Sequence, residues 1–118
     1  MKKMRLYGTT DGSGNATVNG EAPVNGCALY AVRWIDGDLA DGVDAVISTQ
    51  GADASATLLT LTNANDDATY YPREATCDNT GTADGDTTLP FMQGTPRLVI
   101  SSGGDTKSGG CILYYTEL

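Results

Sequence analysis

The sequence of 118 residues contains no histidine, one phenylalanine and one tryptophan. Histidine is the commonest general base, the usual activator of a nucleophile and a frequent ligand of transition metals, so its absence disfavours most acid–base chemistry. The three cysteines, Cys27, Cys77 and Cys111, lie far apart without a Cys-x-x-Cys pair, which disfavours a zinc site. We therefore expect a protein that is not an enzyme and that uses no cofactor.

Positive charge is also scarce, because seven Lys and Arg residues are set against fifteen Asp and Glu residues, for a net charge of -8. An acidic surface repels phosphate backbones and anionic lipids, so we expect neither nucleic acid nor a membrane as a partner. No apolar run follows the basic start "MKKMRLYG", so no signal peptide is expected. The odd number of cysteines favours free, buried thiols in a protein made in a reducing cytoplasm.

The straight-chain residues that favour helices are few, whereas glycine occurs fifteen times. Alternating apolar residues predict short strands at 4–10, 15–20, 26–36, 42–51, 55–63, 96–102 and 109–117. Helix–strand alternation and glycine-rich nucleotide motifs are both missing, which excludes a doubly wound α/β fold. We predict an all-β chain: one antiparallel β-sandwich or jelly-roll-like domain over residues 1–118, with about seven to eight strands.

The strongest strand signal is "GCALYAVRWID" at 26–36. Strict alternation would place Tyr30, Val32 and Trp34 on one face, with Leu29 and Ala31 on the other. Because both faces are largely apolar, we predict a central strand covered on one side by the core and on the other by a loop or another subunit. Two glycine-rich segments, "DGSG" (11–14) and "GGDTKSGG" (103–110), predict hairpin loops.

An aspartate-rich segment, "DGDLADGVD", covers residues 36–44. A helix–loop–helix calcium site requires Asp or Asn at the fifth position, Gly at the sixth and Glu at the twelfth, where this chain has Ala40, Asp41 and Ile47. The two Asp-Gly pairs instead predict successive tight turns between strands. We therefore predict no metal site. The weaker alternative is a loosely held cation on three carboxylates, those of Asp36, Asp38 and Asp41.

Residues 63–95 form a long polar stretch without periodicity. A connection of this length is uncommon in a compact domain unless it has a function. It contains Tyr70, Tyr71, Leu89, Phe91 and Met92, which are too many large apolar residues for a solvated linker. We predict a long polar loop that is ordered and packs either on its own domain or on a partner.

The motif "YYPR" at 70–73 places tyrosine and arginine, two residue types enriched at protein interfaces, beside a proline that restricts the backbone. A local role is the alternative, in which Tyr70 or Tyr71 caps the core while Arg73 pairs nearby. The predicted interface residues are Trp34, Tyr70, Tyr71, Arg73, Phe91 and Met92.

Four stretches, "TTDGSGNATV" (9–18), "ADGVDAVIST" (40–49), "YYPR" (70–73) and "PRLVISSGGDTKSGGCILYY" (96–115), resemble small virion structural proteins of tailed bacteriophages. The resemblance implies a capsid decoration (cement) protein that binds and stabilises the outer shell, or a head accessory protein. It also implies assembly in the host cytoplasm, residence in the virion, and the major capsid protein or another virion protein as partner. Because such domains stack around symmetry axes, we expect a homo-oligomer, specifically a trimer.

The competing interpretation is a carbohydrate-binding, lectin-like β-sandwich module. In that case Trp34, Tyr70 and Tyr71 would form a platform that stacks on a sugar, and the aspartates would hold a calcium ion. Glycan binding, together with a rise in melting temperature on adding calcium, would distinguish this interpretation from a virion role.

Overall fold

The computed structural model describes residues 1–51 and 55–118, and all the strand pairs in it are antiparallel. Its ten strands are β1 (Lys2–Thr9), β2 (Ala16–Asn19), β3 (Val24–Ile35), β4 (Asp44–Gln50), β5 (Ser55–Leu61), β6 (Ala68–Tyr70), β7 (Glu74–Cys77), β8 (Ala83–Thr88), β9 (Phe91–Ser101) and β10 (Ser108–Glu117). The all-β prediction is confirmed. The strand number exceeds the predicted seven to eight because β6, β7 and β8 lie within the polar stretch 63–95.

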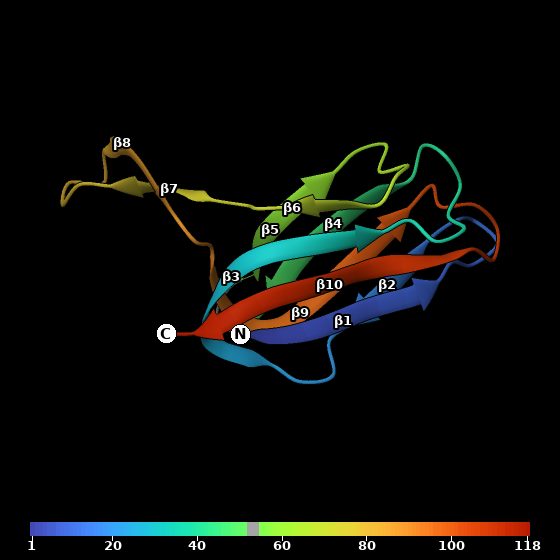
Figure 1. Ribbon diagram of the computed structural model, residues 1–118, viewed down its shortest axis with the longest axis horizontal. Helices are drawn as coiled ribbons and strands as arrows, with labels where there is room; N and C mark the ends of the chain where they lie inside the picture. Colours follow the sequence, from blue (N-terminus) through green and yellow to red (C-terminus); the bar gives the residue numbers. More distant parts are fainter. Residues whose placement is uncertain (52–54) are drawn as a thin grey trace.

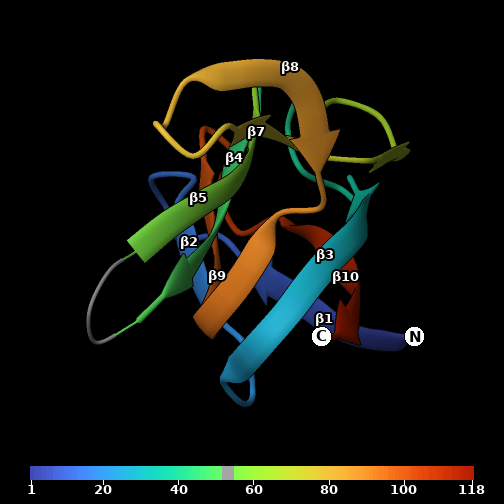
Figure 2. The same cartoon turned by 90° about the vertical axis from the view of Figure 1, so that its left-hand side faces the viewer.

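Eight of the strands form two stacked layers, which we call the body (Figures 1 and 2). The first layer has the order β1-β10-β3-β6, and the second has the order β2-β9-β4-β5. This is the strand order of a jelly roll, so the predicted sandwich or jelly-roll-like fold is confirmed. The strands β7 and β8 pair only with each other and form an insertion between β6 and β9.

The long strand β9 connects the two layers. Its first residues pair with β3, and the remainder pairs with β4 on one side and β2 on the other. Gly94 lies where the pairing changes and has φ 112°, and a Cβ atom there would lie 2.5 Å from the carbonyl oxygen of Gln50. A glycine is therefore required at this corner, where one strand passes from one sheet to the other.

The core lies between the layers and is formed by alternate residues of both sheets. Its largest fully buried side chains include Trp34, Leu29, Ile47, Leu98 and Leu113. Two thiols, those of Cys27 and Cys111, also lie in this core, and burial raises the pKa of the Cys111 thiol to about 12. The prediction of buried thiols is wrong for Cys77, which is exposed on β7.

A β-bulge in β3 changes which residues face the core. Tyr114 of β10 lies opposite Ala31, but the next residue, Tyr115, lies opposite Leu29, so Tyr30 has no opposite residue on β10. As a result Tyr30 is 42% exposed while Leu29 and Val32 are both fully buried. The predicted strict alternation is wrong here, because the bulge separates Tyr30 from the inward-facing Val32 and Trp34.

The two segments predicted as hairpin loops reverse the chain but do not join paired strands. Residues 11–14 connect β1 to β2, and residues 103–107 lie between β9 and β10, yet β1 pairs with β10 and β2 pairs with β9. The hairpin predictions are therefore wrong. Turn residues specify a change of direction, and in a two-layer fold the next strand can enter the other sheet. The first turn is held by Asp11, whose carboxylate accepts hydrogen bonds from the amides of Ser13 and Asn15 at 2.9 and 3.0 Å.

Candidate interface at the root of the arm

The β7–β8 hairpin, residues 74–88, leaves the body and extends along the long axis of the molecule (Figure 1). We call this segment the arm. Every residue of β8 is exposed. The polar stretch 63–95 thus divides into three parts: β6 pairs with β3 of the body, the arm points away from the body, and residues 91–95 begin β9. Packing of the whole stretch on its own domain, one of the two predicted alternatives, is wrong for the arm.

Local hydrogen bonds define the conformation of the arm. The Asp78 carboxylate accepts hydrogen bonds from the hydroxyl of Thr80 and from the amides of Thr80 and Thr82, at 2.7 to 3.1 Å. The Asp84 carboxylate accepts one from the hydroxyl of Thr76, at 2.6 Å. These bonds, first of all those from the Thr80 and Thr76 hydroxyls, hold the pKa values of Asp78 and Asp84 below their usual range, so both are ionised at neutral pH.

The arm contains no large apolar side chain that could form a hydrophobic core. Its sequence, "EATCDNTGTADGDTT", has two alanines and one cysteine as its apolar residues. A lone two-stranded hairpin is at best marginally stable in water, because it buries too little apolar surface to offset the entropy lost on ordering. An arm of this composition therefore has little stability of its own.

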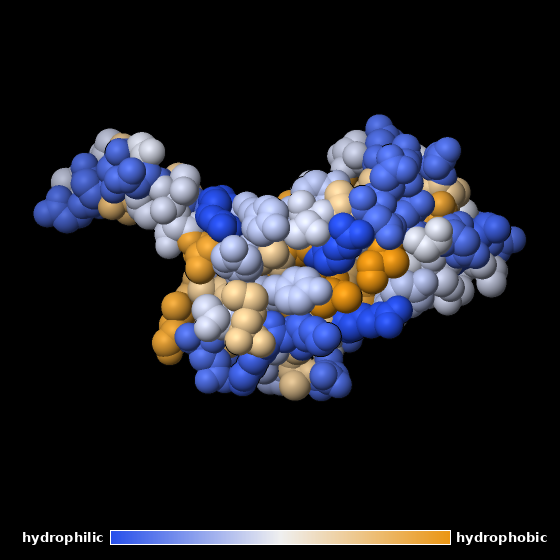
Figure 3. All heavy atoms as spheres, viewed as in Figure 1, coloured by the Kyte–Doolittle hydropathy of each residue, from blue (hydrophilic) through white to orange (hydrophobic). Residues whose placement is uncertain are grey.

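Exposed aromatic side chains gather where the arm leaves the body. Tyr30 and Tyr71 meet edge to face, with ring centroids 5.9 Å apart and an interplanar angle of 84°. The guanidinium of Arg73 lies 5.8 Å from the centroid of the Tyr30 ring, and it donates hydrogen bonds to the carbonyl oxygens of Tyr30 and Pro72 at 3.3 and 2.7 Å. Apolar atoms are visible beside the base of the arm in Figure 3.

Phe91, the first residue of β9, lies just after the arm and is 54% exposed. Tyr71 lies just before the arm and is 57% exposed. We call the four residues Tyr30, Tyr71, Arg73 and Phe91 the root cluster. Three of them were predicted from the sequence as interface residues. Tyr30 was not, because its outward direction depends on the bulge in β3.

Two of the other three predicted interface residues do not lie on the surface. Trp34 and Met92 are both fully buried, and the Trp34 indole N–H donates to the carbonyl oxygen of Ala64 at 2.9 Å. Their assignment to an interface is corrected, and Trp34 is likewise removed from the predicted sugar-stacking platform. Tyr70 is partly buried against the core, opposite Val32, as the local alternative for this residue predicted.

The aspartate-rich segment 36–44 forms two tight turns, as predicted, with Gly37 and Gly42 at φ 59° and 90°. The Asp38 carboxylate accepts a hydrogen bond from the Ser108 amide at 2.6 Å, whereas Oδ1 of Asp36 is buried without a hydrogen-bond partner among residues 1–51 and 55–118. The pKa of Asp36 is raised, mainly because its carboxylate is buried and, to a smaller extent, because the negative charge of Asp67 repels it. Within the same residues, no group of three or more His, Cys, Asp or Glu side chains is placed to hold a metal ion.

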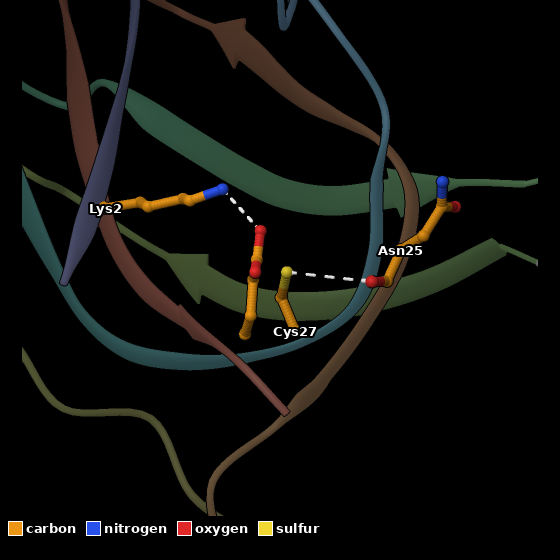
Figure 4. Close-up of polar contacts among 4 residues, drawn as sticks. Lys2, Asn25 and Cys27 are labelled. Atoms are coloured by element: carbon orange, nitrogen blue, oxygen red, sulfur yellow. Dashed lines mark hydrogen bonds and ion pairs between the residues drawn. The ribbon is translucent and has the colours of Figure 1, made fainter.

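An ion pair joins the two ends of the chain, as Figure 4 shows with the neighbouring contact between Cys27 and Asn25. The Lys2 ammonium pairs with the Glu117 carboxylate, and this hydrogen bond raises the pKa of Lys2 and lowers that of Glu117. The Cys27 thiol donates to the backbone carbonyl oxygen of Asn25, with the sulfur and oxygen 3.9 Å apart. Because Glu117 compensates the charge of Lys2, this lysine adds little to the positive potential of its surface.

A cleft of about 540 Å³ lies beside the start of β9. The amide of Gln93 in this cleft donates to the side-chain oxygen of Asn25 at 2.7 Å, and Gln50 donates to the hydroxyl of Ser48 at 2.9 Å. Its lining residues are Pro23, Asn25, Thr49, Gln50, Gly51, Ala56, Phe91, Gln93, Gly94 and Thr95. The cleft thus combines oriented amides with an exposed aromatic ring.

No protein-family model, curated protein or solved structure matches this chain. The described ranges contain no helix long and apolar enough to cross a membrane.

Proposed function

We propose that this protein is a structural component of a virus particle, and most specifically a capsid decoration (cement) protein that binds the outer shell and stabilises it. The sequence resemblance to virion proteins of tailed bacteriophages supports this role. The jelly-roll strand order is compatible with it, because this architecture is common in viral capsid proteins, although lectins use it as well.

The root cluster is the observation that carries the proposal. Large aromatic side chains and an arginine are exposed together at the point where the arm leaves the body, with Tyr30 on β3, Phe91 on β9, and Tyr71 and Arg73 between β6 and β7. Tyrosine and arginine are enriched among the residues that dominate binding energy at protein interfaces, and contiguous exposed apolar patches mark interaction sites. We assign the root cluster to contact with the major capsid protein or another virion protein.

The remaining features of the proposal concern assembly. The chain is made in the host cytoplasm, joins the particle there and forms a homo-oligomer, for which a trimer is our expectation. Repeated copies of a modest interface around a symmetry axis would stabilise a shell without any catalytic residue.

The experiment that tests this function adds purified protein to empty shells that lack it and measures how much cosediments. The Tyr71→Ala/Arg73→Ala variant should fold normally but lose most of its occupancy on the shells. Val99→Ser is the matched control, because Val99 is also exposed, at 38%, but lies on β9 of the other layer. Equal occupancy of both variants would reject the root cluster as the docking site, and no cosedimentation of the wild type would reject the role itself.

A second candidate function is carbohydrate binding, and the cleft beside β9 favours it. Oriented amides supply donors and acceptors for sugar hydroxyls, and Phe91 supplies a face for stacking. Carbohydrate binding in this cleft depends neither on Trp34 nor on the segment 36–44. A glycan array is the test, with Gln93→Ala as the variant, since Gln93 lines the cleft and is not part of the root cluster. Glycan binding that Gln93→Ala abolishes, without affinity for shells, would favour this function over the first.

A further inference from the structure

The charges of this acidic protein are unevenly distributed. The outer face of the first layer carries three of the seven cationic residues, and the described residues of β1, β10 and β3 that point outward beside them include no carboxylate. We call this surface the basic stripe. Its residues are Lys3, Arg5, Tyr7, Arg33, Ile112 and Tyr114. Figure 3 views the molecule from this side and shows strongly hydrophilic atoms next to apolar ones.

The register of the strands fixes the geometry of the stripe. Arg5 of β1 lies opposite Ile112 of β10, and Ile112 lies opposite Arg33 of β3. Neighbouring strands are about 4.8 Å apart, so the Cα atoms of the two arginines are separated by about 10 Å. Lys3 and Tyr114 form the next row. The stripe is therefore a regular array of cations and aromatic rings on a rigid sheet.

Most of this positive charge is not neutralised within the chain. The described residues contain two ion pairs, Lys2 with Glu117 and a long contact of 4.0 Å between Arg33 and Asp67. Lys3 and Arg5 have no carboxylate partner there. The guanidinium of Arg5 lies over the Tyr7 ring, 4.5 Å from its centroid, in a cation–π contact.

The arm has the opposite character. Its four charged residues, Glu74, Asp78, Asp84 and Asp86, are all acidic and all exposed. Within residues 1–51 and 55–118, the carboxylates of Glu74 and Asp86 accept no hydrogen bond that a bound cation would replace. The arm also lacks large apolar side chains, so a charged surface suits it better than a hydrophobic one.

We propose that the arm of one copy lies on the basic stripe of a second copy of this chain. The arm extends away from its own body, so the complementary charges meet between copies rather than within one (Figure 1). Because the two surfaces differ, the contact is heterologous, and it closes into a ring when the rotation between copies allows, as in the expected trimer. This contact specifies the self-association part of the proposed function and does not require a shell.

The first test follows the oligomeric state of the purified wild type by sedimentation velocity as NaCl rises. Because salt shortens the screening length, the association constant should fall about tenfold or more between roughly 50 and 500 mM NaCl if exposed charges hold the copies together. A chain that is monomeric at high concentration in low salt would overturn the proposal, and so would an oligomer that is insensitive to salt.

The second test uses charge reversal. The arm variant Glu74→Lys/Asp86→Lys and the stripe variant Lys3→Glu/Arg5→Glu should each fail to associate, and the chain that combines all four changes should associate again. The control, Arg97→Glu/Lys107→Glu, makes an equal charge change outside the stripe and should associate as the wild type does. If the combined variant stays monomeric while each pair of changes leaves the fold intact, the arm does not bind the stripe.

A third test locates the contact with the arm's own exposed thiol. Wild-type protein, which carries Cys77 in the arm, is mixed under mild oxidation with a Tyr7→Cys/Cys77→Ser chain, or with a Val99→Cys/Cys77→Ser chain as control. The expected result is a covalent dimer with the first partner and little with the second, since Cys27 and Cys111 are buried. Equal crosslinking to both partners would refute the assignment. Binding of single-stranded nucleic acid to the stripe in preference to the arm would also refute it. None of these readouts involves shells, so failure here is distinct from failure of the proposed function.

Discussion

The body and the arm are built from the same kind of strand but depend on different interactions. The body has a core of closely packed aliphatic and aromatic side chains between two layers. The arm has an exposed β8 and no large apolar residue, and its shape depends on hydrogen bonds from threonines and backbone amides to Asp78 and Asp84. Burial of apolar side chains is enough to stabilise the body, whereas the arm buries too little apolar surface to offset the entropy lost when it is ordered.

This difference indicates that the body and the arm have different roles. A rigid body holds the root cluster and the basic stripe in fixed positions, and the arm extends the reach of the molecule beyond its own surface. The glycines have correspondingly different constraints. A Cβ atom at Gly94 of the body would meet the backbone of Gln50 at 2.5 Å, whereas at Gly81 of the arm nothing lies within 4 Å.

A core substitution should lower the stability of the protein most. Trp34→Ala should lower the free energy of unfolding by about 3–5 kcal/mol, because it leaves a large cavity and an unpaired carbonyl at Ala64. Urea denaturation followed by tyrosine fluorescence or circular dichroism measures it. Tyr71→Ala, at an exposed position, should cost less than about 1 kcal/mol. Similar losses for the two variants would show that the root cluster is part of the folded core.

The corner at Gly94 should give the next largest effect. Gly94→Ala places a Cβ atom against the Gln50 backbone and forces a non-glycine residue to φ 112°, so it should cost about 2–3 kcal/mol. Gly81→Ala in the arm also requires a positive φ, 82°, but has open space around it. Its strain should loosen the arm and leave the melting temperature of the body unchanged. A drop in melting temperature with Gly81→Ala would mean that the two regions unfold together.

A smaller effect concerns the pH dependence at Asp36. Burial raises its folded-state pKa above the unfolded value, so the folded form binds the proton more tightly and stability falls as pH rises through that interval. The ionised carboxylate therefore destabilises the fold at neutral pH. Asp36→Asn should stabilise the protein at pH 7 by less than about 1 kcal/mol, because solvent screens part of the charge, and the gain should vanish in acid below the unfolded pKa. A loss of stability at pH 7 would indicate that the carboxylate has a partner in solution.

The smallest effect on stability should come from removing the arm. Glu74 lies opposite Thr88, so two glycines can replace residues 74–88 and join Arg73 to Leu89. The shortened chain should unfold within about 0.5 kcal/mol of the wild type in urea, because the arm contributes no core residue, and it should lose self-association. A large loss of stability in the monomer would contradict the separation of arm and body.

The sequence predicted the body better than it predicted the site. Apolar alternation marks the strands that bury one face, so the central strand 26–36 and the closing strands 96–102 and 109–117 were found. Turn residues gave the turns in 36–44 but not the pairing partners, because the same turn serves a hairpin or a crossing between layers. The strands β7 and β8 carry no periodic signal, since neither face of the arm is buried.

The root cluster shows the same limit at single residues. Tyr71, Arg73 and Phe91 were found from composition, because aromatic and arginine side chains in a polar stretch suggest an interface. Trp34 and Met92 were misassigned to that interface, since large apolar residues are equally typical of a core. Tyr30 was missed because a bulge, which depends on the pairing with β10, turns it outward. In contrast, the basic stripe follows directly from strand register, once β1, β10 and β3 are known to be neighbours.

Hydrogen exchange of the monomeric protein, measured residue by residue at high salt, tests the separation of body and arm most directly. Amides paired within the body, such as those of β3 and β10, should exchange only on global unfolding, whereas those of β7 and β8 should exchange close to the rate of an unstructured chain. On lowering the salt so that copies associate, protection should appear in the arm. Strong protection of the arm in the monomer, equal to that of the body, would contradict the account.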